Sequence, residues 1–578
     1  MRYLVLLILL IEFSLSIKAQ ESFIHNTLDT LKASYRIGGK TLDSIDLVYS
    51  EKFTSTPGSF TSHPFGKFGN DYRSFWSSLS RQHRLLPVIG FKYAALPHLG
   101  TCYAFGSKGT QYLDVEFNQS FSKKIHFSLQ YKRNVATGAY RNNAFSNDFF
   151  SIGGLYKGNH FGHMLSLSTF KQQRNLNGGI SSFSEVEEFG LEYAKVRKQN
   201  SSDSISMFVI DTDSEWNIIK NDSLKTFSII LKNKLAIDKR VFKEKDSLST
   251  LYSNAILFDS LNTRELTQLS RLDNMVGLRI KNQKVLFEIL IDKGYWKYKT
   301  LSTQFKDELD VLANLFVNGK TWNLQTENQF NLLGANQQSK YSLLLIRKGK
   351  KINFECNLNQ SNLLPTPLQR AYITNTINYV LEDLDLQHSQ TIKLSFNTNN
   401  KQSIKLSAFY GNFQNHYFFV NDSWKNDTLK SVSQLTLQAK GDFKLGVFHL
   451  QPNLTLNLVD KIQLLPKYDL RTRFFISKNV KRPGTIFNVG VDVNYLSTYQ
   501  LMTFDDRISM YQMNFKNGNF NDYLMLDAFV SMQLDEFRMY LKMENVDSFW
   551  VSPRNNIAKD YPIVPSIMRL GLTWDFFN

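Results

Sequence analysis

Two acidic residues, two positions apart, are the first candidates for chemistry in this chain. Asp114 and Glu116 lie in "QYLDVEFNQ", and a pair of carboxylates is what general acid–base catalysis often requires. Residues two apart on an extended strand share one face, so the two carboxylates would be neighbours. Rows of charged side chains also line aqueous pores, where they set the electric field that passing ions and solutes experience. We expect this second role.

Other patterns that could do chemistry are incomplete. "DTDSE" (Asp211–Glu215) resembles the start of a calcium loop, but Trp216 stands where that loop needs a glycine. His160 and His163 in "NHFGHM" are expected at a turn and a strand end. No HExxH, paired CxxC, GxSxG or phosphate-loop motif occurs. We therefore expect no catalytic residue, metal ligand or cofactor, and a protein that is not an enzyme.

The residues around these carboxylates alternate between apolar and polar, which is typical of a strand with two unlike faces. A second run with the same alternation follows the polar turn "SFSKK". Pairing the two runs as a hairpin about Phe121 and Ser122 predicts Asp114 near Gln130 and diagonal to Lys132. The apolar face then carries Leu113, Val115, Phe117, Ile125, Phe127, Leu129 and Tyr131.

The same unit recurs along the chain. In Thr391–Tyr410 apolar residues alternate on both sides of a short polar turn, while Lys393 and Lys405 fall on the opposite face. Further runs are Lys351–Asn359, His449–Leu458, Asn488–Tyr495 and Tyr523–Leu534. The predicted polar face includes Asp114, Glu116, Gln130, Lys132, Lys393 and Lys405.

So many amphipathic strands need a cover for their apolar faces. Few helical patterns are available to supply one, whereas a bilayer covers the face directly and closure of the sheet removes unpaired edges. A lysine facing lipid at the midplane costs about 2–4 kcal/mol, so Lys132, Lys393 and Lys405 should face water. We predict an all-β fold, a transmembrane antiparallel β-barrel of about 14–18 strands whose polar face lines a lumen.

Three segments are expected. Residues 1–19 read as a signal peptide cleaved between Ala19 and Gln20, residues 20–100 as an irregular N-terminal extension, periplasmic or partly luminal, and residues 101–578 as the barrel. Long polar stretches between the hairpins are interpreted as external loops, because outer-membrane barrels have short turns at one end and long loops at the other. These stretches are Lys198–Ser206, Asp211–Lys225 and Phe258–Asn274, the last with a short helix.

Composition agrees with this class. The 46 Phe and 26 Tyr suit strands and interfacial girdles. The net charge of +17 raises the possibility of nucleic acid as a partner, but the basic residues are scattered and the signal peptide predicts export, so we expect no nucleic acid. Cys102 and Cys356 could form one disulfide, although the apolar neighbours of Cys356 favour a small outward residue.

Several stretches resemble the putative porin family of Bacteroidetes. They are Arg133–Ser168, Val489–Gln500, Asn517–Val546 and the final Asp560–Asn578, and the resemblance covers most of the chain from about Phe53. It implies an outer-membrane β-barrel with passive transport, and it brings no catalytic or ligand-binding residues to this sequence.

The sequence therefore predicts passive diffusion of small polar solutes or ions across the outer membrane of a Gram-negative bacterium, with a mild preference for anions. An energy-coupled, TonB-dependent-like transporter, a non-conducting structural or adhesive barrel, and an outer-membrane enzyme remain alternatives. The expected partners are outer-membrane lipid, lipopolysaccharide, the barrel assembly machinery and the solutes. Nothing in the sequence specifies an oligomeric state.

The last strand, "IMRLGLTWDFFN", is expected to close the barrel by pairing with the first. Its predicted lipid face carries Met568, Leu570, Leu572, Trp574 and Phe576. Such strands usually end on an aromatic residue, whereas here Asn578 follows the aromatic pair. We therefore expect Phe576 to matter more for assembly than Asn578 does.

Overall fold

The computed structural model describes most of the chain from residue 96 onward. The described residues are 91, 96–221, 225–245, 259, 261–334, 338–381, 385–398, 402–420, 422–426, 430–461, 463, 465–480, 484–512, 518–550 and 556–577. The predicted signal peptide and most of the predicted extension lie outside these residues and stay predictions. The first barrel strand, β1, begins at His98.

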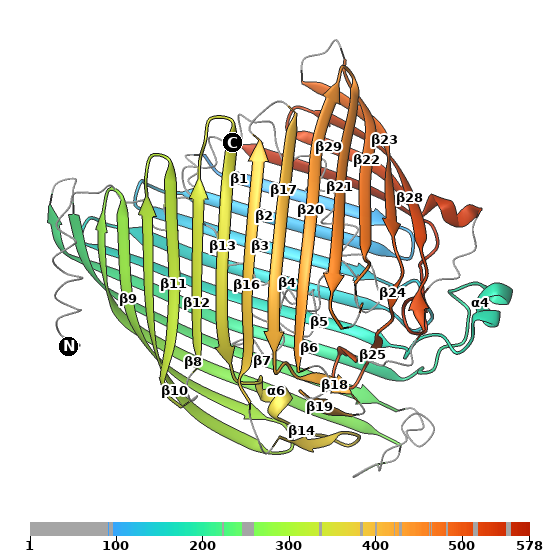
Figure 1. The fold of residues 1–578 in the computed structure, drawn as a ribbon, viewed down its shortest axis with the longest axis horizontal. Coiled ribbons are helices and arrows are strands. Elements are labelled where there is room, and N and C mark those ends of the chain that lie inside the picture. The colour runs from blue at the N-terminus through green and yellow to red at the C-terminus, as the bar shows by residue number, and fades with distance from the viewer. Residues whose placement is uncertain are drawn as a thin grey trace.

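Alternating strands form one closed antiparallel barrel, as the sequence predicts (Figure 1). The barrel has 22 strands, so the expected 14–18 was too few. Its first half comprises β1 (His98–Gly106), β2 (Thr110–Ser120), β3 (Ile125–Ala136), β4 (Phe145–Lys157), β5 (Phe161–Leu176), β6 (Ser201–Asn221), β7 (Lys225–Glu244), β8 (Thr263–Asn282), β9 (Val285–Lys299), β10 (Thr303–Asn318) and β11 (Trp322–Leu333). The second half comprises β12 (Ser339–Arg347), β13 (Ile352–Leu363), β16 (Gln387–Thr398), β17 (Ser403–Gln414), β20 (Ser431–Leu445), β21 (Phe448–Val459), β22 (Tyr468–Asn479), β23 (Thr485–Leu496), β28 (Tyr523–Leu534), β29 (Phe537–Glu544) and β32 (Ile567–Phe577).

The strand count was too low because polar strands were interpreted as loops. Residues 201–206 and 211–221 belong to β6, which is 21 residues long, and residues 263–274 belong to β8 instead of a loop with a helix. A strand needs only about 9–11 residues to cross a bilayer. β6, β7 and β8 have 21, 20 and 20 residues, about twice that length.

The two ends of the barrel differ. Short turns join the strands at the end where β1 begins and β32 ends, and the long connections lie at the other end (Figure 1). This asymmetry is the one expected, although only residues 198–200 and 258–262 of the stretches proposed as loops lie in the long connections. The long connections include α4 (Phe183–Phe189), α6 (Pro367–Arg370) and η3 (Val546–Phe549).

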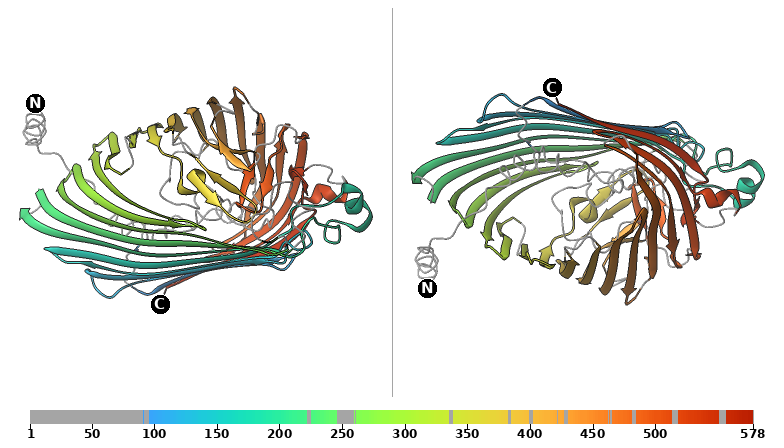
Figure 2. Two further views of the ribbon diagram at one scale, coloured as in Figure 1. Left: turned by 90° about the horizontal axis from the view of Figure 1, so that it is seen from below. Right: turned by 90° about the horizontal axis from the view of Figure 1, so that it is seen from above.

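Some long connections fold back as small hairpins. Figure 2 shows α6 and neighbouring short strands inside the ring of barrel strands. The short strands are β14 (Ala371–Ile373), β15 (Asn378–Val380), β18 (Phe418–Val420), β19 (Ser423–Lys425), β24 (Tyr499–Gln500), β25 (Thr503–Asp505), β26 (Met510–Gln512), β27 (Asn519–Phe520), β30 (Asn556–Ala558) and β31 (Tyr561–Pro562).

The seam between β1 and β32 closes the sheet. All nine residues of β1 pair with β32, with His98 opposite Phe577 and Gly106 opposite Arg569. On β32 the residues Met568 and Trp574 are 54% and 46% exposed on the outer face, as alternation requires. The ring of Trp574 contacts the rings of Phe576 and Phe537 at centroid distances of 4.2 and 5.8 Å.

The two cysteines are not joined. Neither is in a disulfide, and Cys102 lies opposite Asp114 in the sheet while Cys356 lies opposite Leu394. No helix among the described residues is long and apolar enough to cross a membrane.

Candidate functional site

The hairpins inside the ring identify the luminal face of each strand. Arg240 of β7 donates hydrogen bonds to the Tyr372 hydroxyl of β14 at 3.4 Å and to the Arg507 carbonyl, so its side chain points inward. Directly opposed residues on neighbouring strands share a face. Arg240 lies opposite Ile205 of β6 and Thr267 of β8, so these two residues also face the lumen. The same rule identifies the luminal residues of each further strand around the ring.

Asp114, Glu116, Gln130 and Lys132 share this inward face on β2 and β3. Asp114 lies directly opposite Lys132, and Glu116 opposite Gln130, so the expected pairing was two residues off and kept the same faces. The turn is centred on Lys123, and the Ser122 hydroxyl accepts hydrogen bonds from the backbone N–H groups of Lys124 and Ile125, each at 3.2 Å. The correct register lets Lys132 Nζ form an ion pair with Asp114 at 3.0 Å.

Lys393 and Lys405 occupy the same inward face on β16 and β17. Lys405 lies directly opposite a third lysine, Lys440 of β20, which the sequence analysis did not single out. None of the three forms an ion pair within the described part of the chain, and all three are exposed. The nearby Arg471 of β22 differs, because it is paired with Asp469 at 2.9 Å. We call Lys393, Lys405 and Lys440 the unpaired lysine group.

Buried and half-buried cations elsewhere on the luminal face, such as Lys542 and Arg473, have carboxylate partners. Arg473 contacts Asp492 at 2.6 Å, and Lys542 contacts the same carboxylate at 2.9 Å. Arg569 contacts Glu544 at 2.7 Å. A buried charge without a partner costs several kcal/mol, so these pairs are needed for the wall to fold. The unpaired lysine group does not need carboxylate partners because its ammonium groups are exposed to solvent.

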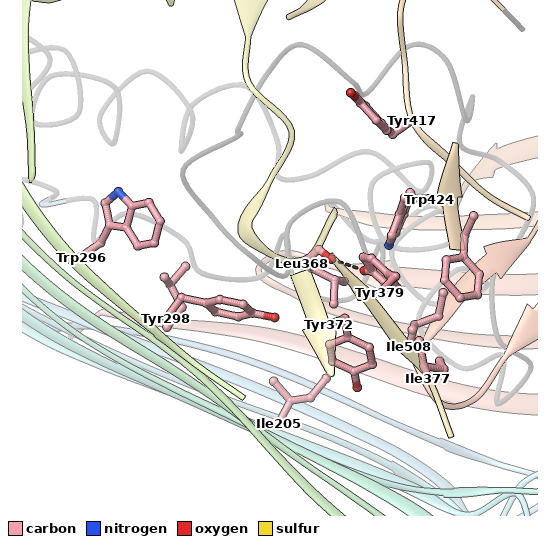
Figure 3. Close-up of a cluster of buried hydrophobic side chains, with 12 residues drawn as sticks. Ile205, Trp296, Tyr298, Leu368, Tyr372, Ile377, Tyr379, Tyr417, Trp424 and Ile508 are labelled. Atoms are coloured by element: carbon pink, nitrogen blue, oxygen red, sulfur yellow. Dashed lines mark hydrogen bonds between the residues drawn. The ribbon is translucent and has the colours of Figure 1, made fainter. Parts of the chain in front are cut away.

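An aromatic assembly lies at the loop end of the lumen. We define the loop cap as α6 together with the hairpins β14–β15, β18–β19 and β25–β26. Its side chains form one buried cluster with residues of β6, β8 and β9 on the barrel wall (Figure 3). The wall contributes Ile205, Leu269, Trp296 and Tyr298, and the cap contributes Leu368, Tyr372, Ile377, Tyr379, Tyr417, Phe419, Trp424 and Ile508.

The sequence analysis missed the loop cap, although a signal for it was available. The connections after β13 and β17 read "AYITNTINYV" and "NHYFFVNDSWKN", which hold far more aromatic residues than a solvated loop requires. Large aromatic side chains in a connection indicate that it is buried against something. In the cap the Tyr379 hydroxyl donates a hydrogen bond to the carbonyl of Leu368, which satisfies its polar end (Figure 3).

A family model described as "Putative porin" matches residues 93–578. A comparison with curated proteins gives no match. The range of the family match includes every barrel strand.

Solved structures of similar fold include an iron transporter, a siderophore receptor and a ferric enterobactin receptor. The FrpB iron transporter from Neisseria meningitidis (F5-1 variant) has a TM-score of 0.59 at 10% identity, covering 84% of this chain and 83% of that chain. The siderophore receptor PirA from Acinetobacter baumannii has a TM-score of 0.58 at 11% identity, covering 84% and 81%. A ferric enterobactin receptor (PfeA) from Pseudomonas aeruginosa has a TM-score of 0.58 at 9% identity, covering 84% and 81%. At such identities the likeness is one of fold.

Proposed function

Because the chain belongs to the family described as "Putative porin", we propose that it is an outer-membrane channel for passive diffusion of small polar solutes and ions, with a preference for anions. The exported chain would reside in the outer membrane of a Gram-negative bacterium, with its long connections outside the cell. Its outer face would contact lipid and lipopolysaccharide after insertion by the assembly machinery.

The unpaired lysine group is the observation that carries this proposal. Its three ammonium groups lie on neighbouring strands of the luminal face, and no carboxylate within the described residues neutralises them by an ion pair. In water a positive charge acts on a passing ion over about 8–10 Å at physiological salt. Three such charges together favour anions near this part of the wall and disfavour cations.

Catalysis is not needed to account for the luminal carboxylates. Asp114 is held by Lys132 at 3.0 Å and also accepts a hydrogen bond from the Tyr112 hydroxyl at 3.1 Å. A carboxylate paired in this way maintains the strand register and balances charge on the wall. We propose that this pair shapes the lumen and takes no part in a reaction.

Single-channel recording tests the proposal. The purified chain, refolded in detergent and shown to be folded by heat-dependent gel mobility, is added to a planar lipid bilayer under a KCl gradient. We expect discrete conductance steps and a reversal potential that is shifted from zero toward the equilibrium potential of chloride. A folded barrel that never conducts would contradict passive diffusion and favour a structural or adhesive role.

The strand count favours a second candidate, an energy-coupled transporter. A 22-stranded barrel is the size at which outer-membrane transporters enclose a plug, and the solved structures of similar fold include an iron transporter and a siderophore receptor. In that case solute uptake into intact cells would stop when the proton-motive force is collapsed. Passive diffusion would continue at an unchanged rate.

A further inference from the structure

The loop cap crosses the lumen from one side of the barrel to the other. The hairpin β25–β26 belongs to the connection between β23 and β28, yet it contacts β7. In the ring order eleven strands separate β7 from β23, and eight strands separate β28 from β7. A connection that begins at β23 and reaches β7 must therefore pass over or through the loop end of the lumen, where Figure 2 shows the enclosed segments.

Arg507 joins the three hairpins of the cap. Its guanidinium donates to Asp505 on its own hairpin at 2.6 and 3.1 Å, and it also contacts the Asp422 carboxylate of the β18–β19 hairpin. A further hydrogen bond of 3.4 Å reaches the Thr376 carbonyl between β14 and β15. Removing this side chain would therefore remove contacts to all three hairpins at once, although the hydrogen bond from the Tyr372 hydroxyl to the Arg507 carbonyl would stay.

Arg240 attaches the same assembly to the barrel wall. Its Nε donates to Asp203 of β6 at 2.8 Å, and its Nη2 donates to the Asp506 carbonyl at 2.8 Å and to Ser509 Oγ at 2.9 Å. Ser509 Oγ in turn donates to Asp203 at 2.6 Å. Arg174 of β5 reinforces the joint by donating to Asp203 at 3.0 Å.

Backbone conformation at this joint is unusual. Ser509 has φ of 57° and Asp422 has φ of 61°, in the left-handed region that residues other than glycine seldom occupy. Such a conformation is unfavourable by itself and persists where surrounding contacts hold it. Here the contacts to Asp203 and Arg507 hold both residues.

We infer that Arg240 and Arg507 are positioning residues that set the upper size limit of the transported solute by holding the loop cap across the lumen. The ring alone would not set a small limit, because a barrel of 16 or more strands encloses an aqueous channel wide enough for large solutes unless something fills it. The cap supplies that restriction. Removing the polar contacts that Arg507 and Arg240 make with it would let the cap move while the hydrogen bonds between the barrel strands stay intact. This inference rests on the proposed function.

Liposome swelling with a series of uncharged sugars, from a pentose to a tetrasaccharide, tests the inference. We expect Arg507→Ala to raise the swelling rate with the trisaccharide and tetrasaccharide at least threefold, with little change for the pentose. The matched control is Arg133→Ala, because Arg133 pairs with Asp148 at 3.4 Å on the outer face and touches no part of the cap. The control should keep the wild-type size limit.

A second variant and a second measurement keep the result interpretable. Ser509→Ala removes a hydrogen bond of the wall joint without removing a charge, and it should shift the size limit in the same direction by a smaller factor. Amide hydrogen exchange should accelerate in residues 371–380 and 503–509 of Arg507→Ala and stay unchanged in the barrel strands.

The outcomes separate the two claims. If the wild type admits the pentose and Arg507→Ala has the same size limit, the inference is overturned while the proposed channel stands. If the wild type and both variants are folded but admit no sugar, the proposed channel fails, and the inference fails with it.

Discussion

Two groups of cations inside this barrel differ in burial and in ion pairing. Arg240 and Arg507 are 1% and 5% exposed, and each is surrounded by carboxylates and carbonyls. The unpaired lysine group is exposed and has no ion-pair partner in the described residues. A buried cation must be neutralised before the protein can fold, whereas an exposed one can keep its charge for use. We therefore propose that the arginines hold the cap and that the lysines act on the solute.

Removing Arg240 tests the structural role of the buried arginines, and we expect it to have the largest effect on the free energy of unfolding. Arg240→Ala leaves Asp203 buried with only Arg174 as a charged partner, and we expect a loss of about 3 kcal/mol in the free energy of unfolding. Urea unfolding in lipid vesicles, followed by tryptophan fluorescence, measures this loss. Arg240→Lys keeps one charge and should lose less, and equal stability of Arg240→Ala and the wild type would refute the assignment.

Acid should lower the stability of the protein through a buried histidine, His416, which lies just before the β18–β19 hairpin of the cap. Burial lowers the pKa of His416 to about 4, below its ordinary value, and the ring contacts Ser389 and Gln387 at 3.0 and 3.1 Å. Because the unfolded chain takes up this proton first, the stabilisation is complete above about pH 6.5 and is lost as the pH falls toward 4, by about 3 kcal/mol in total.

The difference between wild type and His416→Gln isolates this effect from the carboxylates that titrate nearby. Stability of the wild type should fall more steeply than that of His416→Gln between pH 6.5 and pH 4. Parallel curves over that interval would show that the buried ring carries no pH dependence.

The closing strand offers a test outside both cation groups. Phe576→Ser removes an aromatic ring that packs on Trp574 at 4.2 Å, and we expect a loss of about 1–2 kcal/mol and a lower yield of folded barrel in the membrane. Deletion of Asn578 should reduce the yield less. Equal membrane yields of the two variants would remove any special role for Phe576.

Neutralising the lysines should change selectivity with the smallest effect on stability. One charge about 8 Å from an ion in water contributes about 0.2–0.5 kcal/mol once salt screening is included. Each single change, Lys405→Gln or Lys440→Gln, should therefore lower the chloride-to-potassium permeability ratio about 1.5-fold. The urea midpoint of both variants should match that of the wild type, in contrast with Arg240→Ala.

Alternation in the sequence was sufficient to predict the barrel and the two faces of its strands. Leu406 and Phe396 oppose each other on β17 and β16 with Lys405 on the other face, as the pattern indicated. Alternation fixes faces but does not fix strand ends, so polar residues such as those of Asp211–Lys225 were taken for a loop when most continue β6. The strand count was too low for the same reason.

The register and the cap depend on information that periodicity lacks. Asp114 pairs with Lys132 and not with Gln130 because of where the turn lies. The hydroxyl of one side chain, Ser122, stabilises that turn. The contact of Arg240 with Ser509 joins residues 269 positions apart and arises only once the ring has closed. Lys440 was overlooked because its neighbours follow the same alternation as every other strand, and only its position opposite Lys405 distinguishes it.

The reversal potential of the wild type and of one triple variant tests the central claim most directly. Lys393, Lys405 and Lys440 are replaced together by glutamine, and the control replaces Lys123, Lys124 and Lys350, three exposed lysines at the short turns, in the same way. We predict an anion preference in the wild type and the control and a permeability ratio at least threefold lower in the triple variant. A cation preference in the wild type, or a ratio unchanged by the triple substitution, would contradict the account.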